Sequence, residues 1–518
     1  MASGVVETSL GRIRGRESQG VRTFLGVPYA DSTAGPARFR PPRPHPRWTG
    51  VRDATEFGQT CPQPPLSGLL DARPSVISML PLFGVPTSVE NQGEQCLVLN
   101  IWTSCADADA PRPVLVWLHG GANFGAGDWP RFNGSALARD GGLVVVTLNH
   151  RVGILGHLDL SWTGVPGYEH SGNAGILDLR MALGWLRDNV AAFGGDPGNI
   201  TVAGGSRGAS RLATLLATGG EPPFHKAIMV SPPPPRSTCP ASPQEAARGV
   251  LDRLGIPADR PDLLARASVK QLLDVNDELE RAQRWYRFQP VVDGAPVEAR
   301  AYADLAAGVA PTMPLLIGSA LNETTRVLDA DPGDWDDCDD TELAERCSRL
   351  ARCDVSALVQ EYRRLRPDNP ARKIAVTVTT DAMYRFPALA LASARNNTAT
   401  APAYAYIFTG GTGSHGEDVL YFFHNLERAA LVTDNEVNQR LADEASGAWI
   451  TFCRQGRPTV PGVDDWPPHH DSGRLTLLFG NPTRVASNPF AAGRARWEEN
   501  PSQDWAPVFT GRRPEPTR

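Results

Sequence analysis

The sequence contains no run of about 18 consecutive apolar residues, so it predicts no helix that crosses a membrane. Its first eight residues lack the basic and apolar segments of a secretory signal peptide, and we therefore expect a cytoplasmic protein. The eight cysteines are scattered without the paired spacing of a zinc site, which argues against a metal centre. The formal net charge of -6 is too small and too dispersed to indicate nucleic acid or a membrane surface as a partner.

The chain also lacks internal repeats and low-complexity linkers, so nothing in it marks a boundary between domains. Its 518 residues, 41% of them hydrophobic, suffice for one large α/β unit with a sizeable core. Short apolar runs alternate with helical segments, a pattern that predicts a mostly parallel sheet covered by helices on both faces. The strand-like runs lie at residues 96–102, 113–118, 143–148, 200–203, 226–230, 314–317 and 403–408.

What the sequence does contain is a distinctive turn at residues 204–208, Gly-Gly-Ser-Arg-Gly. The apolar run at residues 200–203 precedes it, and a leucine spacing that suits a helix follows it. A serine between a strand and a helix takes a strained backbone conformation, and glycines two residues before and after it let the chain pass without Cβ clashes. The alternative is an ordinary serine in a glycine-rich loop. The flanking strand and helix favour the nucleophile elbow, Gly-x-Ser-x-Gly, with Ser206 as the nucleophile.

A second glycine-rich turn, His-Gly-Gly-Ala at residues 119–122, follows the apolar run at residues 113–118. A serine nucleophile needs a base, an acid that orients the base, and donors for the oxyanion. Glycines allow backbone N–H groups to converge on one point, and the turn matches the His-Gly-Gly type of oxyanion loop. An ordinary turn at the end of a strand is the alternative. We expect His119 to brace this loop rather than to act as the base.

The base should be a histidine in a loop that follows a strand. Of the ten histidines, His415 fits best, because it follows the strand-like run at residues 403–408 in a glycine-rich loop. His424, His469 and His470 are rivals by position alone. The last two stand in a polar, proline-flanked segment, and we expect them to face solvent.

The acid that orients the base cannot be chosen by residue type alone from 57 aspartates and glutamates. Glu323 stands in a loop after the strand-like run at residues 314–317, a position comparable to that of His415. Glu323 is therefore a candidate, and the residues themselves do not decide between it and other carboxylates.

Further motifs follow one another along nearly the whole chain. They are Phe-Leu-Gly-Val-Pro-Tyr-Ala at 24–30, Cys-Pro-Gln at 61–63, Glu-Gln-Cys-Leu-Val-Leu-Asn at 94–100, Asn-His-Arg-Val-Gly at 149–153, Gly-Asn-Ala-Gly at 172–175, Phe-Gly-Gly-Asp-Pro at 193–197, Pro-Val-Val-Asp-Gly at 290–294, Ser-His-Gly at 414–416 and Trp-Pro-Pro at 466–468. Together with the two glycine turns, they resemble the type-B carboxylesterases of the α/β-hydrolase fold. This family includes cholinesterases and bacterial p-nitrobenzyl esterases.

The resemblance implies a catalytic triad and an oxyanion hole by position in these motifs. It makes Ser206 the nucleophile, Glu323 the acid and His415 the base. The oxyanion hole would be formed by backbone N–H groups, those of Gly121, Ala122 and Arg207. The enzyme would then hydrolyse a small-molecule ester through an acyl-enzyme intermediate, without a cofactor or a metal.

The resemblance also carries expectations about the rest of the chain. Residues 1–518 would form a single α/β-hydrolase domain with helical insertions around residues 241–284 and 335–400. Cys61 and Cys96 would be the family's N-terminal disulfide pair, although a cytoplasmic location could keep them reduced. Two buried ion pairs are expected, Arg38 with Glu94 and Arg151 with Asp178. The sequence does not predict an oligomeric state.

The sequence departs from the family pattern close to the nucleophile. Gly205 stands where glutamate is usual, and Arg207 stands where alanine is usual. The oxyanion loop at residues 122–127 is short, and Val-Ser-Pro at residues 230–232 replaces the usual ending of the next strand. Arg207 either pairs with a carboxylate or selects a substrate that bears a carboxylate or an electron-rich carbonyl.

Two other functions remain as alternatives to ester hydrolysis. The first is acyl transfer or lactone processing in a biosynthetic pathway, in which an alcohol replaces water. The second is a non-catalytic binding protein of the neuroligin type, which the presence of all three triad residues disfavours.

Overall fold

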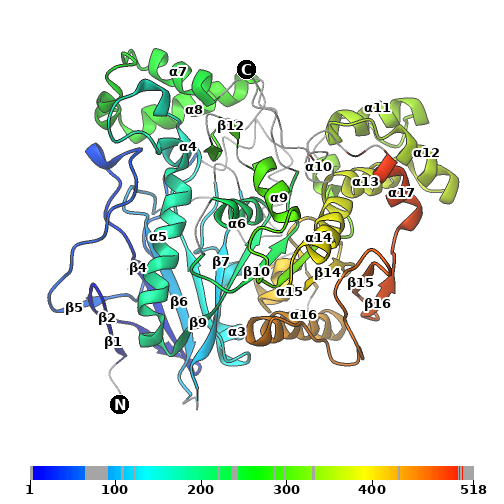
Figure 1. The fold of residues 1–518 in the computed structure, drawn as a ribbon, viewed down its shortest axis with the longest axis horizontal. Coiled ribbons are helices and arrows are strands. Elements are labelled where there is room, and N and C mark those ends of the chain that lie inside the picture. The colour runs from blue at the N-terminus through cyan, green and yellow to red at the C-terminus, as the bar shows by residue number, and fades with distance from the viewer. Residues whose placement is uncertain are drawn as a thin grey trace.

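The computed structural model describes most of the chain. The described residues are 4–64, 91–106, 110–121, 124–218, 222–234, 243–283, 288–292, 295–296, 298–329, 333–429, 432–433, 435–499, 501 and 505. Among them, eleven strands form one twisted sheet that runs through the middle of the molecule (Figure 1). Their order across the sheet is β16 (Arg484–Ser487), β15 (Leu475–Phe479), β14 (Ala403–Phe408), β13 (Leu315–Ala320), β10 (Lys226–Val230), β9 (Gly195–Gly205), β7 (Arg112–Leu118), β8 (Val144–Leu148), β6 (Val98–Ser104), β4 (Val21–Pro28) and β3 (Arg16–Ser18).

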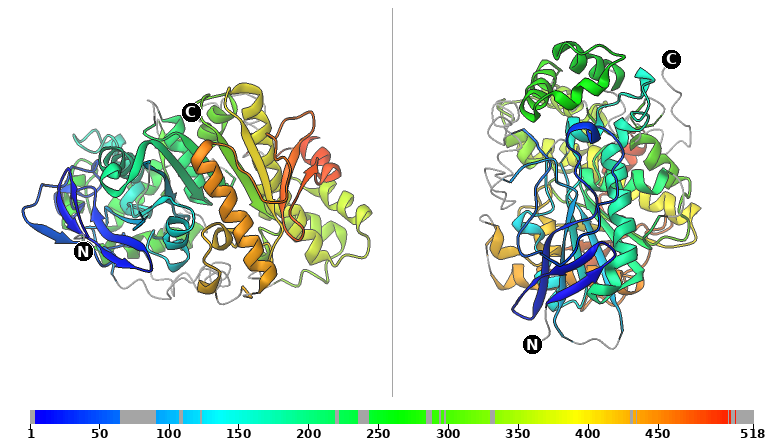
Figure 2. Two further views of the ribbon diagram at one scale, coloured as in Figure 1. Left: turned by 90° about the horizontal axis from the view of Figure 1, so that it is seen from below. Right: turned by 90° about the vertical axis from the view of Figure 1, so that its left-hand side faces the viewer.

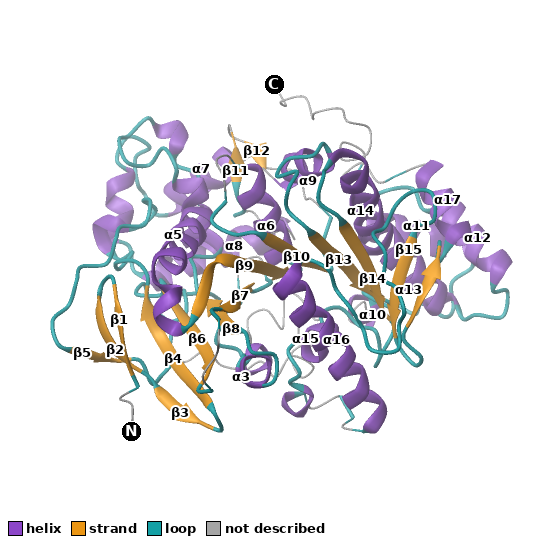
Figure 3. Cartoon of the chain, turned by 60° about the horizontal axis from the view of Figure 1, so that its bottom comes forward, coloured by secondary structure: helices purple, strands orange, loops and turns teal. Residues whose placement is uncertain are grey.

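The central part of this sheet is parallel. From β8 to β15 each neighbouring pair of strands is parallel, whereas β6, β4 and β3 at one edge and β16 at the other pair antiparallel (Figure 3). Two small sheets lie apart from it, β1 (Val5–Thr8), β2 (Gly11–Arg14) and β5 (Val51–Asp53) in one, and β11 (Val291–Val292) and β12 (Ala295–Pro296) in the other. Each predicted strand-like run overlaps a strand of the large sheet.

Helices cover both faces of the sheet (Figure 2). On β7, Val114 and Val116 pack into one buried apolar cluster, while Leu115 and Trp117 pack into another. This alternation is the period of a strand whose two faces are both covered, and it explains why the run is apolar throughout. The structure therefore confirms the predicted mostly parallel sheet between two layers of helices.

The helices of the two layers come from different parts of the chain. The cluster that contains Trp117 is closed by α3 (Ser135–Arg139), α15 (Asp418–Phe422) and α16 (Glu436–Gln455). The other cluster draws on a larger set: α4 (Gly153–His157), α5 (Ala174–Asn189), α6 (Arg207–Ala217), α7 (Pro243–Arg253), α8 (Val269–Gln283), α9 (Glu298–Ala306), α10 (Thr325–Asp329), α11 (Asp340–Ala351), α12 (Ser356–Leu365), α13 (Ala371–Thr380), α14 (Phe386–Thr398) and α17 (Ala491–Glu499).

Both segments in which we expect insertions are helical. Helices α7 and α8 lie at the upper left of Figure 1, and α11 and α12 lie at its right. Between α13 and α14 the chain forms one π-helical turn, η7 (Asp381–Arg385). The assignment of residues 1–518 to a single domain stays a prediction. In the described part of the chain no helix is long and apolar enough to span a membrane.

The two expected ion pairs are present and buried. Arg38 Nη2 lies 2.7 Å from Glu94 Oε2, and Arg151 Nη2 lies 2.6 Å from Asp178 Oδ1. Both arginines make two parallel hydrogen bonds to their carboxylate, the geometry that best offsets the desolvation of a buried charge pair. The first pair joins two N-terminal segments, and the second joins the loop after β8 to α5.

Cys61 and Cys96 lie together as free, buried thiols. A hydrogen bond with Cys61 and burial raise the pKa of the Cys96 thiol well above its ordinary value. The structure thus brings together the two cysteines that the family resemblance pairs, but it holds them in the reduced form.

Candidate active site

Ser206 lies between the end of β9 and the start of α6, in a strained backbone conformation. Its φ is 52° and its ψ is -123°, a region that residues with a side chain rarely adopt. The N–H of Ser206 donates to the carbonyl of Val230 at 2.8 Å, which ties the turn to the end of the neighbouring strand β10. The side chain is half-buried. The predicted elbow is therefore present, with strand before it and helix after it.

The glycines of the elbow are required by close backbone contacts. A Cβ on Gly204 would lie 2.4 Å from the Gly208 carbonyl oxygen, and a Cβ on Gly208 would lie 2.1 Å from the Leu118 carbonyl oxygen. A Cβ on Gly205 would lie 2.8 Å from the Trp117 ring. Because Trp117 is fully buried, the glutamate that is usual at this position does not fit here without a shift of the tryptophan.

Glu323 and His415 are in direct contact, although 92 residues separate them in the sequence. His415 Nδ1 lies 2.5 Å from Glu323 Oε2. The other carboxylate oxygen accepts from Ser231 Oγ at 2.6 Å and from the Ala320 N–H at 2.7 Å. Glu323 is fully buried, so these bonds replace the water that an exposed carboxylate would have. They hold it in one orientation against the imidazole ring.

Strand topology places Ser206 at the same edge of the sheet as this pair. Ser206 follows β9, Glu323 follows β13 and His415 follows β14, and these strands run parallel in the order β9, β10, β13 and β14. Carboxyl ends of parallel strands meet at one edge, where ligands of open α/β sheets bind. The side chain of His415 remains 15% exposed there. The three predicted residues thus follow strands that end at the same edge of the sheet.

The rival histidines lie outside this arrangement. His424 is paired with Asp443, with Nε2 at 2.8 Å from Oδ1, and His470 is exposed as expected. The expectation that His469 faces solvent is wrong. His469 is fully buried, its N–H donates to the Ala403 carbonyl at 2.9 Å, and burial lowers its pKa to about 4.

The glycine turn after β7 packs against the nucleophile. A Cβ on Gly120 would lie 3.3 Å from Ser206 Cβ. Gly121 has φ of 87°, and a Cβ there would lie 2.1 Å from the Phe124 carbonyl oxygen, so only glycine fits. The second predicted donor of this loop, Ala122, lies outside the described residues. Arg207, the donor predicted from the elbow, is the first residue of α6 and directly follows Ser206.

Comparison with known proteins agrees with this geometry. The family model described as "Carboxylesterase family" matches residues 2–497. The chain belongs to the carboxylesterase family. It is 33% identical to the para-nitrobenzyl esterase of Bacillus subtilis (strain 168) over 515 residues, which cover 96% of this chain and 99% of that protein. It is 32% identical to the phenmedipham hydrolase of Pseudarthrobacter oxydans, with 92% of this chain and 95% of that protein covered.

Solved structures lead to the same family. A carboxylesterase of Geobacillus stearothermophilus superposes with a TM-score of 0.79 at 30% identity, covering 95% of this chain and 99% of the other. A PNB esterase superposes with a TM-score of 0.77 at 30% identity and the same coverage. These likenesses confirm the predicted α/β-hydrolase fold. The present chain is therefore a carboxylesterase, an ester hydrolase of the serine class. The comparisons support neither of the alternative functions, acyl transfer or a binding-only role.

Two residues that support the carboxylesterase site could not be singled out from the sequence. The first is Ser231, which follows β10 with φ of 49° and bonds Glu323. The only signal for it was the unusual Val-Ser-Pro ending of that strand. The second is Arg211, a buried arginine of α6 that donates to the carbonyls of His119 and Gly121 at 3.1 and 2.8 Å. No local pattern distinguishes it from an ordinary helix residue.

His119 has the role expected of it. It is fully buried, its Nδ1 lies 2.8 Å from the Gly120 carbonyl oxygen, and its ring stacks on that of His150. Burial, with a contribution from the positive charge of Arg211, lowers the pKa of His119 to about 3. His119 is therefore neutral at neutral pH, and its contact with a carbonyl makes Nδ1 the protonated nitrogen. It braces the loop through its contact with the Gly120 carbonyl.

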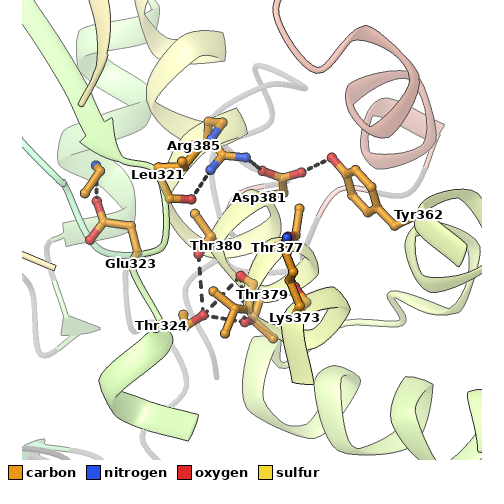
Figure 4. Close-up of polar contacts among 12 residues, drawn as sticks. Leu321, Glu323, Thr324, Tyr362, Lys373, Thr377, Thr379, Thr380, Asp381 and Arg385 are labelled. Atoms are coloured by element: carbon orange, nitrogen blue, oxygen red, sulfur yellow. Dashed lines mark hydrogen bonds and ion pairs between the residues drawn. The ribbon is translucent and has the colours of Figure 1, made fainter. Parts of the chain in front are cut away.

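The loop that carries Glu323 is held by the π-helical turn η7 (Figure 4). Arg385 donates to the Leu321 carbonyl and pairs with Asp381, which in turn accepts from the Tyr362 hydroxyl. Asp381 and Arg385 are both fully buried. From the same turn, the Tyr384 ring packs on His415 with 5.2 Å between ring centroids. One turn thus supports both the acid loop and the face of the base.

Proposed function

We propose that Ser206, Glu323 and His415 are the catalytic triad of this ester hydrolase. The observation that carries the proposal is the 2.5 Å contact between His415 Nδ1 and the buried Glu323, at the sheet edge where Ser206 sits in its strained turn. His415 Nε2 takes the proton of Ser206 as its oxygen attacks the ester carbonyl. Glu323 orients the imidazole and stabilises the imidazolium.

The tetrahedral intermediate carries negative charge on the former carbonyl oxygen. In this proposal, backbone N–H groups of Gly121, Ala122 and Arg207 donate to that oxygen. His415 then protonates the leaving alcohol, and the acyl group remains on Ser206. Water, deprotonated by His415, attacks the acyl carbon and releases the acid, which restores the serine. Every proton in this cycle passes through His415.

A small-molecule ester is the substrate class that fits the family. The names of relatives mention para-nitrobenzyl esters, phenmedipham and, for a relative from Sphingopyxis macrogoltabida at 30% identity, fumonisin B1. We therefore propose p-nitrophenyl acetate as the first assay substrate. We also propose a cytoplasmic location, as expected from the sequence.

The triad is tested by replacing the nucleophile. Ser206→Ala should lower kcat/KM for p-nitrophenyl acetate by roughly 10⁴-fold or more and abolish labelling by a fluorophosphonate probe. Ser210→Ala is the matched control, because this serine lies one turn further along α6 and its hydroxyl contacts Tyr302 instead of the site. It should keep both activity and labelling. A folded Ser206→Ala protein that is still labelled would refute the assignment.

A further inference from the structure

Arg211 is a buried charged residue in the helix that begins at the nucleophile. It stands five residues after Ser206 in α6, and only 4% of it is exposed. A guanidinium in such a place is costly unless its N–H groups are bonded. Two of them donate to backbone carbonyls, Nη1 to His119 at 3.1 Å and Nη2 to Gly121 at 2.8 Å. Both acceptors belong to the glycine turn that packs on Ser206.

Three consecutive carbonyls of this turn are held by side chains. Arg211 holds those of His119 and Gly121, and the His119 ring holds that of Gly120 between them. In a trans peptide the N–H points away from the preceding carbonyl. The N–H of Gly120 therefore points away from Arg211, and the N–H of Gly121 points away from the His119 ring. These bonds fix the orientation of two peptide groups of the turn, and the second of them carries the N–H of Gly121, a proposed oxyanion donor.

We infer that Arg211 is a positioning residue for the oxyanion hole. Its guanidinium fastens the glycine turn to the nucleophile helix, so that the oxyanion donors and Ser206 keep one relative geometry. The inference rests on the proposed roles of Ser206 and of the glycine turn. Arginine suits this task because its planar fork binds two carbonyls at once, whereas the compact ammonium of lysine does not reproduce that geometry.

The surroundings of Arg211 favour this role over a simple structural one. His119, His150 and His157 are buried, and burial together with the charge of Arg211 lowers their pKa values, so all three are neutral at neutral pH. The positive charge of Arg211 consequently lies behind a loop in front of which negative charge develops during the reaction. A residue that only filled space would contribute no such charge.

The test compares Arg211→Met and Arg211→Lys with wild type in p-nitrophenyl acetate hydrolysis. It also measures inhibition by a trifluoromethyl ketone. In that inhibitor, the Ser206 oxygen bonds to the carbonyl carbon, His415 accepts the serine proton, and the ketone oxygen becomes an oxyanion. The inhibitor constant therefore reports on the oxyanion hole without turnover. Arg395→Met is the matched control, since Arg395 is also buried and donates to the carbonyls of Ala310 and Met313, away from the site.

We expect Arg211→Met to lower kcat on the order of 10–100-fold, less than the loss of an oxyanion donor itself, with KM within about threefold. The inhibitor constant should rise by a similar factor, and Arg211→Lys should fall between Met and wild type in both readouts. Arg395→Met should lower the melting temperature but keep kcat within about twofold. If Arg211→Met does not fold, Arg211→Lys carries the test.

Folded Arg211 variants with kcat and inhibitor constant within about twofold of wild type would overturn the inference. A fall in kcat with an unchanged inhibitor constant would also overturn it, because the oxyanion hole would then be intact. Failure of the triad assignment gives a different result: the wild-type enzyme would be labelled at a serine other than Ser206.

Discussion

Two buried arginines support the two sides of the active site in different ways. On the nucleophile side, Arg211 donates to two carbonyls of the glycine turn, in a cluster of neutral histidines. On the acid side, Arg385 donates to the Leu321 carbonyl and also pairs with Asp381 in the same π-helical turn (Figure 4). An arginine thus holds a loop on each side of the site, and on the acid side it also forms an ion pair within its own turn.

The difference matches the charge that each side handles in the proposed mechanism. Negative charge appears in the oxyanion hole only during the reaction, and a cation behind that loop favours it. Glu323, in contrast, must stay negatively charged, because its charge stabilises the imidazolium that forms on His415. A support with a balanced ion pair holds its loop without competing with His415 for Glu323. The comparison predicts that the two sides respond differently to substitution.

The largest effect should come from the acid itself. Glu323→Gln keeps the size of the side chain but replaces one carboxylate oxygen with an N–H₂ group, which can face His415 Nδ1 and favour the wrong tautomer. We expect kcat to fall by roughly 10³-fold or more, with the fold intact. Glu427→Gln, at an exposed position, is the control and should be without effect. Near-normal turnover by Glu323→Gln would remove Glu323 from the triad.

Breaking the ion pair on the acid side should mainly affect stability. Asp381→Asn leaves the buried charge of Arg385 without its carboxylate, which costs about 3–5 kcal/mol of unfolding free energy. Asp381→Asn combined with Arg385→Met removes both charges and should recover a large part of that loss. Urea unfolding of the three variants measures it. A double variant no more stable than Asp381→Asn would show that the charge pair is not what holds this turn.

The third prediction concerns Asp418, a fully buried carboxyl three residues after His415. Burial, reinforced by the charge of Glu323, raises its pKa from 3.8 to about 7, while His415, Tyr406 and Arg131 act in the opposite direction. The folded protein therefore binds more protons than the unfolded chain between about pH 4 and pH 7. Stability should fall as pH rises through this window and level off above it.

The size of this fall should be a few kcal/mol at most, at about 1.4 kcal/mol per pKa unit. Asp418→Asn removes the titrating group and should flatten the profile of unfolding free energy between pH 5 and pH 8. Urea unfolding of wild type and Asp418→Asn across this pH range measures the two profiles. Parallel profiles for the two would mean that Asp418 does not titrate there.

Sequence reasoning identified the site where the signal is local. The elbow around Ser206 and the turn at Gly121 are short glycine patterns, and close backbone contacts at those glycines require them. The contact between Glu323 and His415 joins segments 92 residues apart, so only the family resemblance could pair them.

The supporting residues could not be predicted, because tertiary packing creates their roles. Ser231, Arg211 and Arg385 bind a carboxylate or carbonyls supplied by distant segments. The error at His469 has the same origin. Its polar, proline-flanked segment looks exposed, but its backbone bonds to Ala403 at the start of β14, and this places the side chain in the interior.

The smallest effect is expected at Arg207, on the nucleophile side, where the sequence departs from the family pattern. Its backbone N–H is a proposed oxyanion donor whatever its half-buried side chain does, so substitution tests the guanidinium alone. If the guanidinium reaches the substrate, it recognises a planar anion through two parallel hydrogen bonds. Arg207→Ala should then leave hydrolysis of a neutral short-chain ester within about threefold of wild type.

Hydrolysis of an ester that carries a free carboxylate should fall further in Arg207→Ala. The expected loss is roughly 1.5–3 kcal/mol of transition-state stabilisation, the range for a hydrogen bond to a charged group. The measurement is the ratio of kcat/KM for the anionic ester to that for the neutral ester, in wild type and variant, at low salt, where charge interactions are least screened. An unchanged ratio would make Arg207 a structural residue. In that case the charge of the substrate would not be recognised beside Ser206. Arg211, behind the oxyanion loop, would then be the arginine of the nucleophile side that matters for catalysis.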